Sequence, residues 1–557
     1  MEQIWLKNYP KQVAEHIELN QYESILDVFD ESVRKFRNKN AFENFGGTLT
    51  YNELDVLSGQ FASYLQNTLG LKRGDRIAIQ LPNVLQFPIV MFGALRAGLI
   101  VVNTNPLYTA AEMKHQFNDS GAKAIVILAQ FAHLLEKIQH ETPIKHVVVT
   151  QVGDQLPWIK KNLINFVLKT VKKMVPPYNL EHHTWSDVLA KGSEGNYVQP
   201  NLKQTDIAFL QYTGGTTGVS KGAVLTHKNI IANMLQICSW MRPKLIEGEE
   251  VSLAPLPLYH IFSLTVCCLA FMRYGAKNIL ITNPRDIPAF IKVMRKEKFT
   301  IMAGVNTLFN AIANHPDAKS VDYSGVKVCV AGAMALQKSV KDQWKNVTGT
   351  DVIEGYGLTE SSPVVCCNPI DGTDRVGTIG LPLPDTQVCI KDDNGKDITA
   401  TGEPGELCVK GPQVMQGYYN RPEETAKVII DGWLHTGDIA VMDKDGFFKI
   451  VDRKKDMILV SGFNVYPNEV EDIIARHPKV LEVAAIGVPN EHSGEVVKVF
   501  VVKKDSSLTE KEVIDFAKES LTNYKIPKHV QFVNELPKTN VGKVLRRALR
   551  DINQQNS

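Results

Sequence analysis

Up to about residue 376, segments in which hydrophobic residues have helical spacing alternate with short apolar runs that are typical of strands. Residues 49–66 are apolar at about every third or fourth position, which predicts an amphipathic helix. Short apolar runs predict strands at 76–83 and 99–102, and a helical pattern over 84–96 separates them. The alternation continues with predicted helices at 110–120, 227–240 and 286–298 and predicted strands at 123–128, 207–212, 251–254 and 326–330. Such alternation is typical of βαβ units and mostly parallel sheets.

Beyond about residue 376 the spacing changes to that of β-hairpins. Short apolar stretches alternate with Asn-Gly and Asp-Gly pairs, which accept the backbone conformation of tight turns. After residue 455 helical and strand patterns return. We therefore predict an α/β protein with a large N-terminal domain, 1–452, and a small α+β C-terminal domain, 453–557. The large domain would contain two βαβ-type sheet subdomains and a β-rich subdomain at about 376–452.

Composition and charge disfavour a nucleic-acid-binding protein, a C-x2-C zinc protein and a secreted protein. The 557 residues are 44% hydrophobic, which suffices for several cores, since single cores rarely exceed about 250–300 residues. The 62 basic and 60 acidic residues nearly cancel, so charge gives no reason to expect nucleic acid as a partner. None of the eight cysteines forms the C-x2-C pairs of zinc sites, and we expect buried thiols in a reducing compartment. The charged N-terminus lacks a hydrophobic signal core, which favours the cytoplasm.

Residues 156–177 form a basic amphipathic pattern that stands apart from the rest of the chain. The apolar side chains that share its helical face are Ile159, Leu163, Phe166, Val167, Val171 and Met174. The lysines that populate the remainder are Lys160, Lys161, Lys169, Lys172 and Lys173. Such a helix usually turns its apolar face to a core and its lysines to water. The alternative is peripheral contact with a membrane surface, here the inner face of the cell membrane.

The segment Tyr212–Ala223 reads YTGGTTGVSKGA and follows an apolar run at 207–210. Backbone N–H groups of such a glycine-rich loop can surround phosphate oxygens, with hydroxyls and a lysine as further donors. It is not a Walker A loop, because Lys221 precedes a glycine instead of Ser or Thr. The segment also fits G-x-S-x-G, with Ser220 in the nucleophile position. In that motif a buried strand runs straight into the serine, whereas here six polar or glycine residues precede it, which disfavours a hydrolase.

Four further motifs carry side chains suited to nucleotide chemistry. Tyr356 lies between two glycines, where its ring could stack on a base, and Glu360 nearby could hold Mg2+ on phosphates. Asp438 follows a glycine and could accept hydrogen bonds from a ribose diol. Lys543 lies in a basic C-terminal loop, and His260 ends an apolar stretch. Taken singly, Lys543 is better explained as part of a solvated basic tail and His260 as a structural histidine, while the other residues could simply be turn residues.

Taken in order, five motifs resemble the sequential core motifs of the adenylate-forming superfamily of acyl-CoA synthetases, luciferases and adenylation domains. They are YTGGTTGVSKGA, YGLTE, GWLHTGD, DRKKDMI and PKTNVGK. The resemblance spans nearly the whole chain, and residues 431–471 most resemble bacterial long-chain fatty acid–CoA ligases. It implies that a fatty acid and ATP, with Mg2+, form an acyl-adenylate and pyrophosphate, after which coenzyme A displaces AMP. A CoA ligase for a medium-chain or aryl acid is the alternative, and a homodimer is common among such proteins.

The resemblance also implies roles for individual residues of the nucleotide site. Tyr356 would pack on adenine, Thr359 would lie near the α-phosphate, and Glu360 would bind Mg2+. Asp438 and Arg453 would hold the ribose. The residues that would cradle the β- and γ-phosphates are Thr213, Gly214, Gly215, Thr216, Thr217, Gly218 and Lys221.

Three implied roles concern the acyl group and the small domain. Lys543 would bridge the carboxylate and the α-phosphate during adenylation, and His260 would line the acyl site. The family rotates its small, mobile domain between half-reactions about a hinge that corresponds to Lys455. The residues that would then face the coenzyme A tunnel are Ser461, Gly462 and Phe463.

Overall fold

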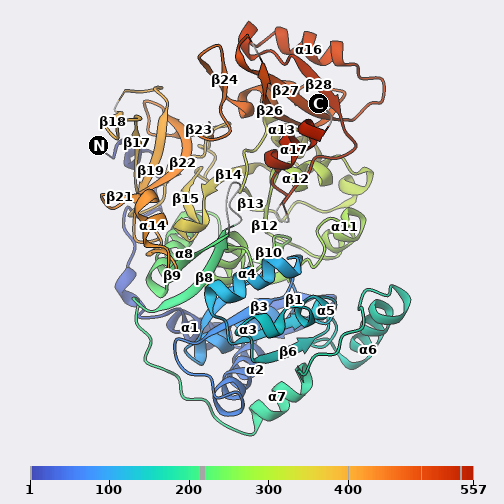
Figure 1. The fold of residues 1–557 in the computed structure, drawn as a ribbon. Helices are drawn as coiled ribbons and strands as arrows, with labels where there is room; N and C mark the ends of the chain where they lie inside the picture. The colour runs from blue at the N-terminus through green and yellow to red at the C-terminus, as the bar shows by residue number, and fades with distance from the viewer. Residues whose placement is uncertain (1–2, 214–219, 399, 491, 540–541, 556–557) are drawn as a thin grey trace.

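Four β-sheets and the helices around them form the structure, a computed structural model that describes residues 3–213, 220–398, 400–490, 492–539 and 542–555. Two large sheets occupy the lower and central part of the molecule in Figure 1. A third sheet stands beside them at the upper left, and the fourth lies at the top with the C-terminal helices.

The first large sheet has nine strands, and its middle is parallel. Its central strands are buried along nearly their whole length, which is typical of parallel sheets covered on both faces. In spatial order the strands are β16 (Leu381–Pro382), β15 (Val364–Cys367), β14 (Val352–Gly357), β13 (Val328–Ala331), β12 (Ile301–Gly304), β10 (Val251–Ala254), β11 (Lys277–Leu280), β1 (Asn40–Asn44) and β2 (Gly47–Thr50). Beyond β14 the pairing becomes antiparallel, so β14 ends in a tight return to β15.

The second large sheet has eight strands and is parallel from β7 to β8. Its spatial order is β20 (Gly417–Tyr418), β9 (Lys221–Thr226), β8 (Ile207–Thr213), β4 (Ile100–Asn103), β3 (Arg76–Gln80), β5 (Ala124–Leu128), β6 (His146–Thr150) and β7 (His183–Thr184). At its edge β9 pairs antiparallel with both β8 and β20. This edge brings the end of the predicted phosphate loop next to residues that follow it by about two hundred positions.

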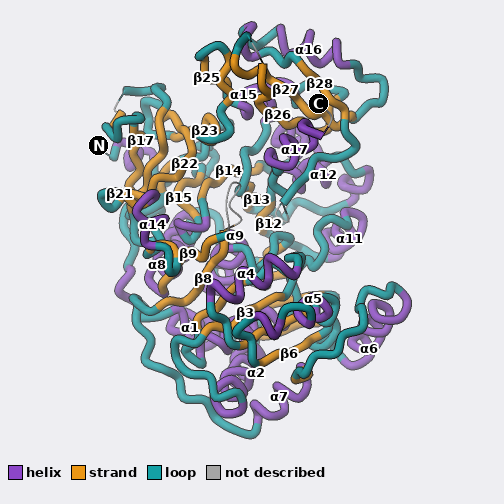
Figure 2. Tube along the Cα trace, viewed as in Figure 1, coloured by secondary structure: helices purple, strands orange, loops and turns teal. Residues whose placement is uncertain are grey.

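The third and fourth sheets are largely antiparallel. The third contains β18 (Asp397–Ile398), β17 (Gln387–Lys391), β19 (Gly405–Lys410), β22 (Trp433–Met442) and β21 (Ile429–Ile430), and β23 (Phe448–Arg453) pairs with β22. The fourth contains β25 (Phe463–Val465), β24 (Ile458–Val460), β27 (Gly494–Lys503) and β26 (Val480–Asn490), and β28 (His529–Phe532) pairs with β27. Figure 2 shows the strands of the fourth sheet apart from those of the two large sheets.

Helices begin where the sequence supplies caps. α4 coincides with the predicted helix 110–120: the Thr109 hydroxyl accepts from the Glu112 amide at 3.3 Å, and Gly121 (φ 64°) ends the helix. The longer helices are α1 (Ile25–Phe36), α2 (Tyr51–Ser63), α3 (Gln86–Arg96), α4 (Ala110–Ser120), α6 (Trp158–Phe166), α7 (Trp185–Ser193), α8 (His227–Met241), α11 (Ile287–Lys296), α12 (Asn306–Ala313), α13 (Lys338–Thr348), α15 (Pro467–Ile474), α16 (Glu510–Lys518) and α17 (Arg546–Gln555). The shorter ones are α5 (Ala132–Glu136), α9 (Ile261–Ser263), α10 (Phe271–Arg273) and α14 (Pro422–Val428).

The hydrophobic cores of the N-terminal and C-terminal residues are separate clusters. The main core draws on residues from Trp5 to Phe448, whereas the C-terminal residues from Ile458 onward pack into clusters of their own. All eight cysteines are buried free thiols, as predicted. The predicted fold class is confirmed, including the antiparallel β-rich part, while the boundaries 1–452 and 453–557 remain predictions.

The expectation that residues 156–177 turn their apolar face to a core is wrong. The side chains of Ile159, Leu163 and Phe166 are 73%, 60% and 58% exposed, and α6 projects from the edge of the molecule (Figure 1). The core contacts come instead from Ile164 and Leu168 on a neighbouring stripe of the helix. Within the described residues, no helix is both long enough and apolar enough to cross a membrane.

Candidate active site

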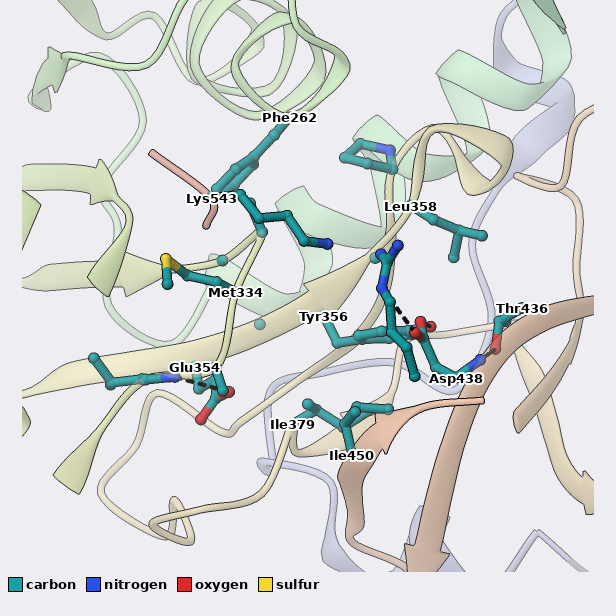
Figure 3. A pocket seen from close by; sticks show the side chains of 18 of the residues that line it. Phe262, Met334, Glu354, Tyr356, Leu358, Ile379, Thr436, Asp438, Ile450 and Lys543 are labelled. Atoms are coloured by element: carbon teal, nitrogen blue, oxygen red, sulfur yellow. Dashed lines mark hydrogen bonds and ion pairs between the residues drawn. The ribbon is translucent and has the colours of Figure 1, made fainter. Parts of the chain in front are cut away.

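One cavity of about 1400 Å³ lies between the two large sheets, the third sheet and the C-terminal part of the chain. It gathers side chains that are far apart in the sequence. The predicted site residues that line it are Thr213, Lys221, His260, Tyr356, Thr359, Glu360, Asp438, Arg453, Lys455 and Lys543. In Figure 3 Lys543 extends toward the space between Phe262 and Leu358, with Tyr356 and Asp438 below it.

The two ends of the predicted phosphate loop are adjacent strands. Thr213 ends β8 and pairs with Lys221 at the start of β9. The predicted residues Gly214, Gly215, Thr216, Thr217 and Gly218 lie outside the described part of the chain. Ser220 donates its hydroxyl to the Thr213 carbonyl at 2.7 Å, and a strand follows it. A nucleophile elbow requires a helix at that point, so the structure excludes the hydrolase interpretation of Ser220.

The Lys221 ammonium already has an anionic partner in this structure. It lies 2.8 Å from Glu424 Oε2 and 4.6 Å from the centre of the Tyr418 ring. Hydrogen bonds and charge from Lys221 and Lys427 lower the pKa of Glu424 to about 2, so this carboxylate is ionised at neutral pH. Glu424 and Tyr418 could not be predicted from the motifs, because only the pairing of β9 with β20 brings their segment to the loop.

A hydrogen-bonded cluster joins the end of β14 to β22 and β23. The Tyr356 hydroxyl donates to Asp438 Oδ2 at 2.6 Å, and Asp438 Oδ1 lies 3.3 Å from Arg453 Nε. Asp438 and Arg453 lie opposite one another in this antiparallel pair of consecutive strands, which brings their side chains together. The Asp438 amide donates to the Thr436 hydroxyl at 3.1 Å, which helps to fix the carboxylate. Removal from water and the charge of Asp438 raise the pKa of Tyr356.

The glycines around Tyr356 allow close backbone approach. A Cβ on Gly357 would lie 2.1 Å from the carbonyl oxygen of Pro363, where β15 returns. A Cβ on Gly332, after β13, would lie 2.9 Å from the Phe262 ring and 3.5 Å from the Gly355 carbonyl oxygen. Glycine at both strand ends therefore lets neighbouring backbone and the Phe262 ring pack closely beside the strand that carries Tyr356, which a side chain at either position would prevent.

Glu360 lies in the turn Thr359–Ser361 that follows β14. Its Oε1 accepts the Tyr418 hydroxyl at 2.7 Å, and its backbone carbonyl accepts from the Met415 amide at 2.7 Å. Both contacts hold the carboxylate at the wall of the cavity near Lys221. Glu360 thus has one oxygen engaged with the protein and a second with no partner among the described residues.

Lys543 enters the cavity from the loop between β28 and α17. The loop is closed on itself, because the Thr539 amide donates to the Lys543 carbonyl at 2.7 Å and the Lys543 amide donates to the Thr539 hydroxyl at 3.1 Å. Removal from water and the nearby Arg453 lower the pKa of Lys543 to about 7. Among the residues that the structure describes, no carboxylate forms an ion pair with this ammonium. The lysine is therefore free to pair with an anion that enters the cavity.

His260 begins the short helix α9 and faces the same space. Its Nδ1 accepts from the Phe262 amide at 3.3 Å, so Nε2 carries the proton in the neutral ring. Removal from water and the charge of Lys543 lower its pKa to about 4. His260 is consequently neutral near pH 7 and adds no second positive charge beside Lys543.

Comparisons with known proteins identify the family. Residues 29–419 match the family described as AMP-binding enzyme, and residues 469–543 match the AMP-binding enzyme C-terminal domain. The chain belongs to the AMP-binding enzyme family. It is 53% identical over 552 residues to the long-chain-fatty-acid–CoA ligase of Escherichia coli O157:H7, which covers 99% of this chain and 98% of that protein.

Solved structures agree with this assignment. The AMP-binding enzyme described here is similar to the anthranilate CoA ligase AuaEII in complex with anthranoyl-AMP, with a TM-score of 0.86, 25% identity, and coverage of 96% of this chain and 98% of that one. It is also similar to ATP-bound MatB from Rhodopseudomonas palustris, with a TM-score of 0.81, 28% identity and coverage of 95% and 99%. The predicted adenylate-forming family is confirmed by these findings.

Polar side chains on α12 and directly after it contact the enzyme's C-terminal part. The Thr307 hydroxyl donates to the Gly542 carbonyl at 3.5 Å, directly beside Lys543. Asn310 Nδ2 donates to the Leu481 carbonyl at 3.2 Å, and Lys504 Nζ donates to Asn314 Oδ1 at 3.1 Å. These three polar contacts involve partly or fully exposed groups, and contacts of this kind are compatible with movement of one part against the other.

Lys455, the predicted hinge, follows directly after the β22–β23 pair. Removal from water and the charge of Arg453 lower its pKa. The neighbouring Asp456 accepts from Arg550 at 2.9 Å and lies 3.6 Å from Arg546, both on α17. The chain therefore passes at Lys455 from contacts with the third sheet to contacts with the C-terminal part. Its role as a hinge remains a prediction.

The residues predicted to face the coenzyme A tunnel do not line the cavity in this structure. Ser461 (φ 51°) and Gly462 (φ 82°) form the turn between β24 and β25, and Phe463 is 57% exposed. The Phe463 ring stacks on Tyr524 at 4.9 Å. None of the three predicted residues is among the described residues that line the cavity. This arrangement brings Lys543 to the site but does not bring this turn to it.

Glu354 is a cavity residue to which the sequence analysis assigned no role. Its Oε1 accepts from the Leu336 amide at 3.2 Å (Figure 3). Removal from water raises its pKa to about 8, so the carboxyl group is protonated at neutral pH and can also donate a hydrogen bond. Glu354 lies two residues before Tyr356 on β14, so the two side chains are on the same face of the strand. This spacing is the signal that could have indicated Glu354 as a site residue.

Proposed function

We propose that this enzyme activates a long-chain fatty acid with ATP and then transfers the acyl group to coenzyme A. The first half-reaction yields an acyl-adenylate and pyrophosphate, and the second yields acyl-CoA and AMP. The observation that carries the proposal is the convergence of Lys543 with the Tyr356–Asp438–Arg453 cluster in one cavity. The 53% identity to a long-chain-fatty-acid–CoA ligase supports the choice of acid.

The nucleotide would lie against the end of β14. Tyr356 offers a ring for adenine, and Asp438 with Arg453 offers an acceptor pair and a donor for the ribose diol. Thr213 and Lys221 mark where the triphosphate would pass, and Lys221 would exchange Glu424 for phosphate oxygens. Such an exchange costs little, because the ion pair is partly exposed to solvent.

Lys543 would act in the attack of the carboxylate on the α-phosphorus. A new carboxylate O–P bond forms while the bond to the β-phosphate oxygen breaks, and pyrophosphate leaves with that electron pair. Two anions must approach one another in this step, so an unpaired cation at the point of attack offsets their repulsion. This role is supported by two observations: Lys543 lines the cavity, and it forms no ion pair with a carboxylate among the described residues.

Mg2+ fits the residues of this site, with Glu360 as its protein ligand. Mg2+ on nucleotides is usually held by one or two carboxylates together with substrate phosphates, so a set of several protein ligands is not needed. Glu360 is held by Tyr418 through one oxygen, which leaves the other for an ion. When bound, the ion would neutralise phosphate charge, and Thr359 beside Glu360 would offer a hydroxyl to the α-phosphate.

The second half-reaction requires a different group at the acyl carbon. We infer that the C-terminal part turns about Lys455, which withdraws Lys543 and brings the Ser461–Phe463 turn toward the cavity. The thiol of coenzyme A would then attack the acyl carbon, and AMP would leave with the electron pair of the C–O bond. The polar, limited contacts on α12 permit such a change.

The acyl chain would extend along the apolar part of the cavity beyond His260. Apolar lining residues come from α8 and the helical segment after α9, and they include Ile237, Trp240, Met241 and Val266. A neutral His260 suits the border between this region and the reacting carboxylate. The anthranilate ligase AuaEII has a similar structure, so an aryl or medium-chain acid remains the alternative substrate.

Pyrophosphate release tests the proposal directly. The purified enzyme is given ATP, Mg2+ and either no acid, one of a series of fatty acids from butyrate to stearate, or benzoate. We expect release only with acid, with the highest kcat/KM among acids of 14 to 18 carbons, and acyl-CoA only when coenzyme A is added. A maximum for benzoate or octanoate would replace the long-chain assignment, and acid-independent release would contradict the adenylation reaction.

A further inference from the structure

An apolar ridge faces solvent along α6 and the π-helical turn Val167–Val171 that continues it. We call it the α6 ridge, and its side chains are 50–77% exposed: Trp158, Ile159, Leu163, Phe166, Val171 and Met174. These six are among only 16 exposed large hydrophobic residues in the part of the chain that the structure describes. Exposed single apolar residues need no explanation, but a contiguous cluster of this kind marks an interaction surface.

The ridge is held in place from behind. Ile164 and Leu168 pack against the main core on the stripe next to the ridge. Asn165 donates to Asp154 Oδ1 and accepts from the Gly153 amide, both at 2.9 Å. The helix therefore cannot turn its apolar stripe inward without breaking these contacts. α6 stands at the edge of the molecule, away from the cavity and the C-terminal part (Figure 1).

The charges around the ridge have one sign. Residues 156–177 contain five lysines and no acidic residue. Two of the lysines contact other parts of the protein: Lys160 Nζ donates to the Gly46 carbonyl at 2.8 Å, and Lys161 lies 3.9 Å from Asp154. The three at the far end of the ridge are exposed and form no ion pair with any described residue: Lys169, Lys172 and Lys173.

We propose that the α6 ridge docks the enzyme on an anionic membrane surface. Its apolar side chains would enter the boundary between headgroups and acyl chains, and its three free lysines would contact lipid phosphates. Phe45, which is 51% exposed, would join them, because Lys160 also donates to its carbonyl at 3.3 Å.

Charge favours a membrane over a second copy of the chain. A two-fold interface would place this lysine-rich segment against its own copy, with no acidic residue of the segment to compensate. The benefit to catalysis rests on the proposed function: a long-chain fatty acid partitions into bilayers, so an enzyme bound there meets its substrate at high local concentration.

Vesicle flotation tests the docking without any catalysis. The full-length enzyme is mixed with vesicles of pure phosphatidylcholine, or with vesicles that contain 30% phosphatidylglycerol. We expect flotation with the anionic vesicles and its loss at high salt. Leu163→Glu with Phe166→Glu should reduce the partition coefficient at least about tenfold, since charge in the interface opposes insertion. Replacing Lys169, Lys172 and Lys173 by Gln should reduce it on the order of 100-fold, at about fivefold per lysine.

Matched controls separate docking from misfolding and from dimer formation. Val198→Glu with Ile246→Glu adds the same charge at positions that are 78% and 52% exposed but lie outside the ridge, and should float like the wild type. All variants should keep wild-type kcat/KM on octanoate in solution, whereas the ridge variants should lose activity on palmitate embedded in anionic vesicles. Flotation unaffected by the ridge variants would overturn the proposal. So would a dimer, seen by light scattering, that the ridge variants dissociate while vesicle binding persists.

Discussion

Replacing Lys543 by methionine should separate the two half-reactions. The substitution keeps an unbranched, flexible side chain as far as Cε, but it removes the ammonium. The structure places that ammonium in the cavity with no carboxylate partner among the described residues, and its pKa of about 7 reflects removal from water. When the side chain is protonated, its charge is therefore available to the reacting anions and is only weakly screened.

The size of the effect follows from that environment. A unit charge about 4 Å from the attacking and leaving oxygens, at an effective dielectric constant of about 20, contributes about 4 kcal/mol. Because each 1.36 kcal/mol is about tenfold in rate, adenylation should slow by roughly 1000-fold. In the proposed mechanism the second half-reaction does not use the Lys543 ammonium, so the rate of thioester formation should change by less than about threefold.

Two assays measure the halves independently. ATP–pyrophosphate exchange with palmitate reports adenylation, and acyl-CoA formation from supplied palmitoyl-adenylate reports thioester transfer. Lys538→Met is the matched control, because Lys538 lies on the same loop and also lines the cavity but is already paired with Glu482 at 2.6 Å. An equal loss in both assays, or a loss confined to the second, would refute the role of Lys543.

Four further outcomes are expected. The pKa of about 7 means that Lys543 loses its proton as pH rises, so kcat/KM for ATP should fall above pH 7, and Lys543→Arg should move that decline to higher pH. Lys455→Pro should leave pyrophosphate exchange intact but abolish thioester formation, because proline restricts the backbone change of a hinge. Lys221→Met should raise the KM for ATP at least about tenfold, since it removes a phosphate contact; an unchanged KM would contradict that role. Gly357→Ala should cost about 1–3 kcal/mol of stability in urea unfolding, because its Cβ would lie 2.1 Å from the Pro363 carbonyl oxygen.

Local pattern was sufficient to predict much of the fold. α4 has the predicted bounds because Thr109 and Gly121 are strong signals for the two ends of a helix, and β10 has the bounds of its apolar run. Ten of the residues that the motifs indicated line one cavity, whereas Ser461, Gly462 and Phe463 do not. In each case the information lies within a few residues of the sequence, where capping, turn chemistry and apolar spacing act.

Contacts set by long-range pairing could not be predicted in this way. Glu424 meets Lys221, and Tyr418 meets Glu360, only because β20 adds to the edge of the second sheet. The face of α6 is a similar case. Periodicity identifies which of its side chains share a stripe, but not whether a neighbouring element covers that stripe, since this depends on where the helix sits in the finished fold.

The position of the Asp438–Arg453 pair along the chain separates two tasks in the proposed cycle. Both residues precede Lys455 and are joined across β22 and β23, so they stay with the third sheet whatever the C-terminal part does. Lys543 follows Lys455 and would depart with that part. The acyl-adenylate, a reactive mixed anhydride, would then remain fixed by its ribose while the group that made it is replaced by the group that consumes it. Exchange of the catalytic partner would not require release of the intermediate, which protects it from hydrolysis in solution.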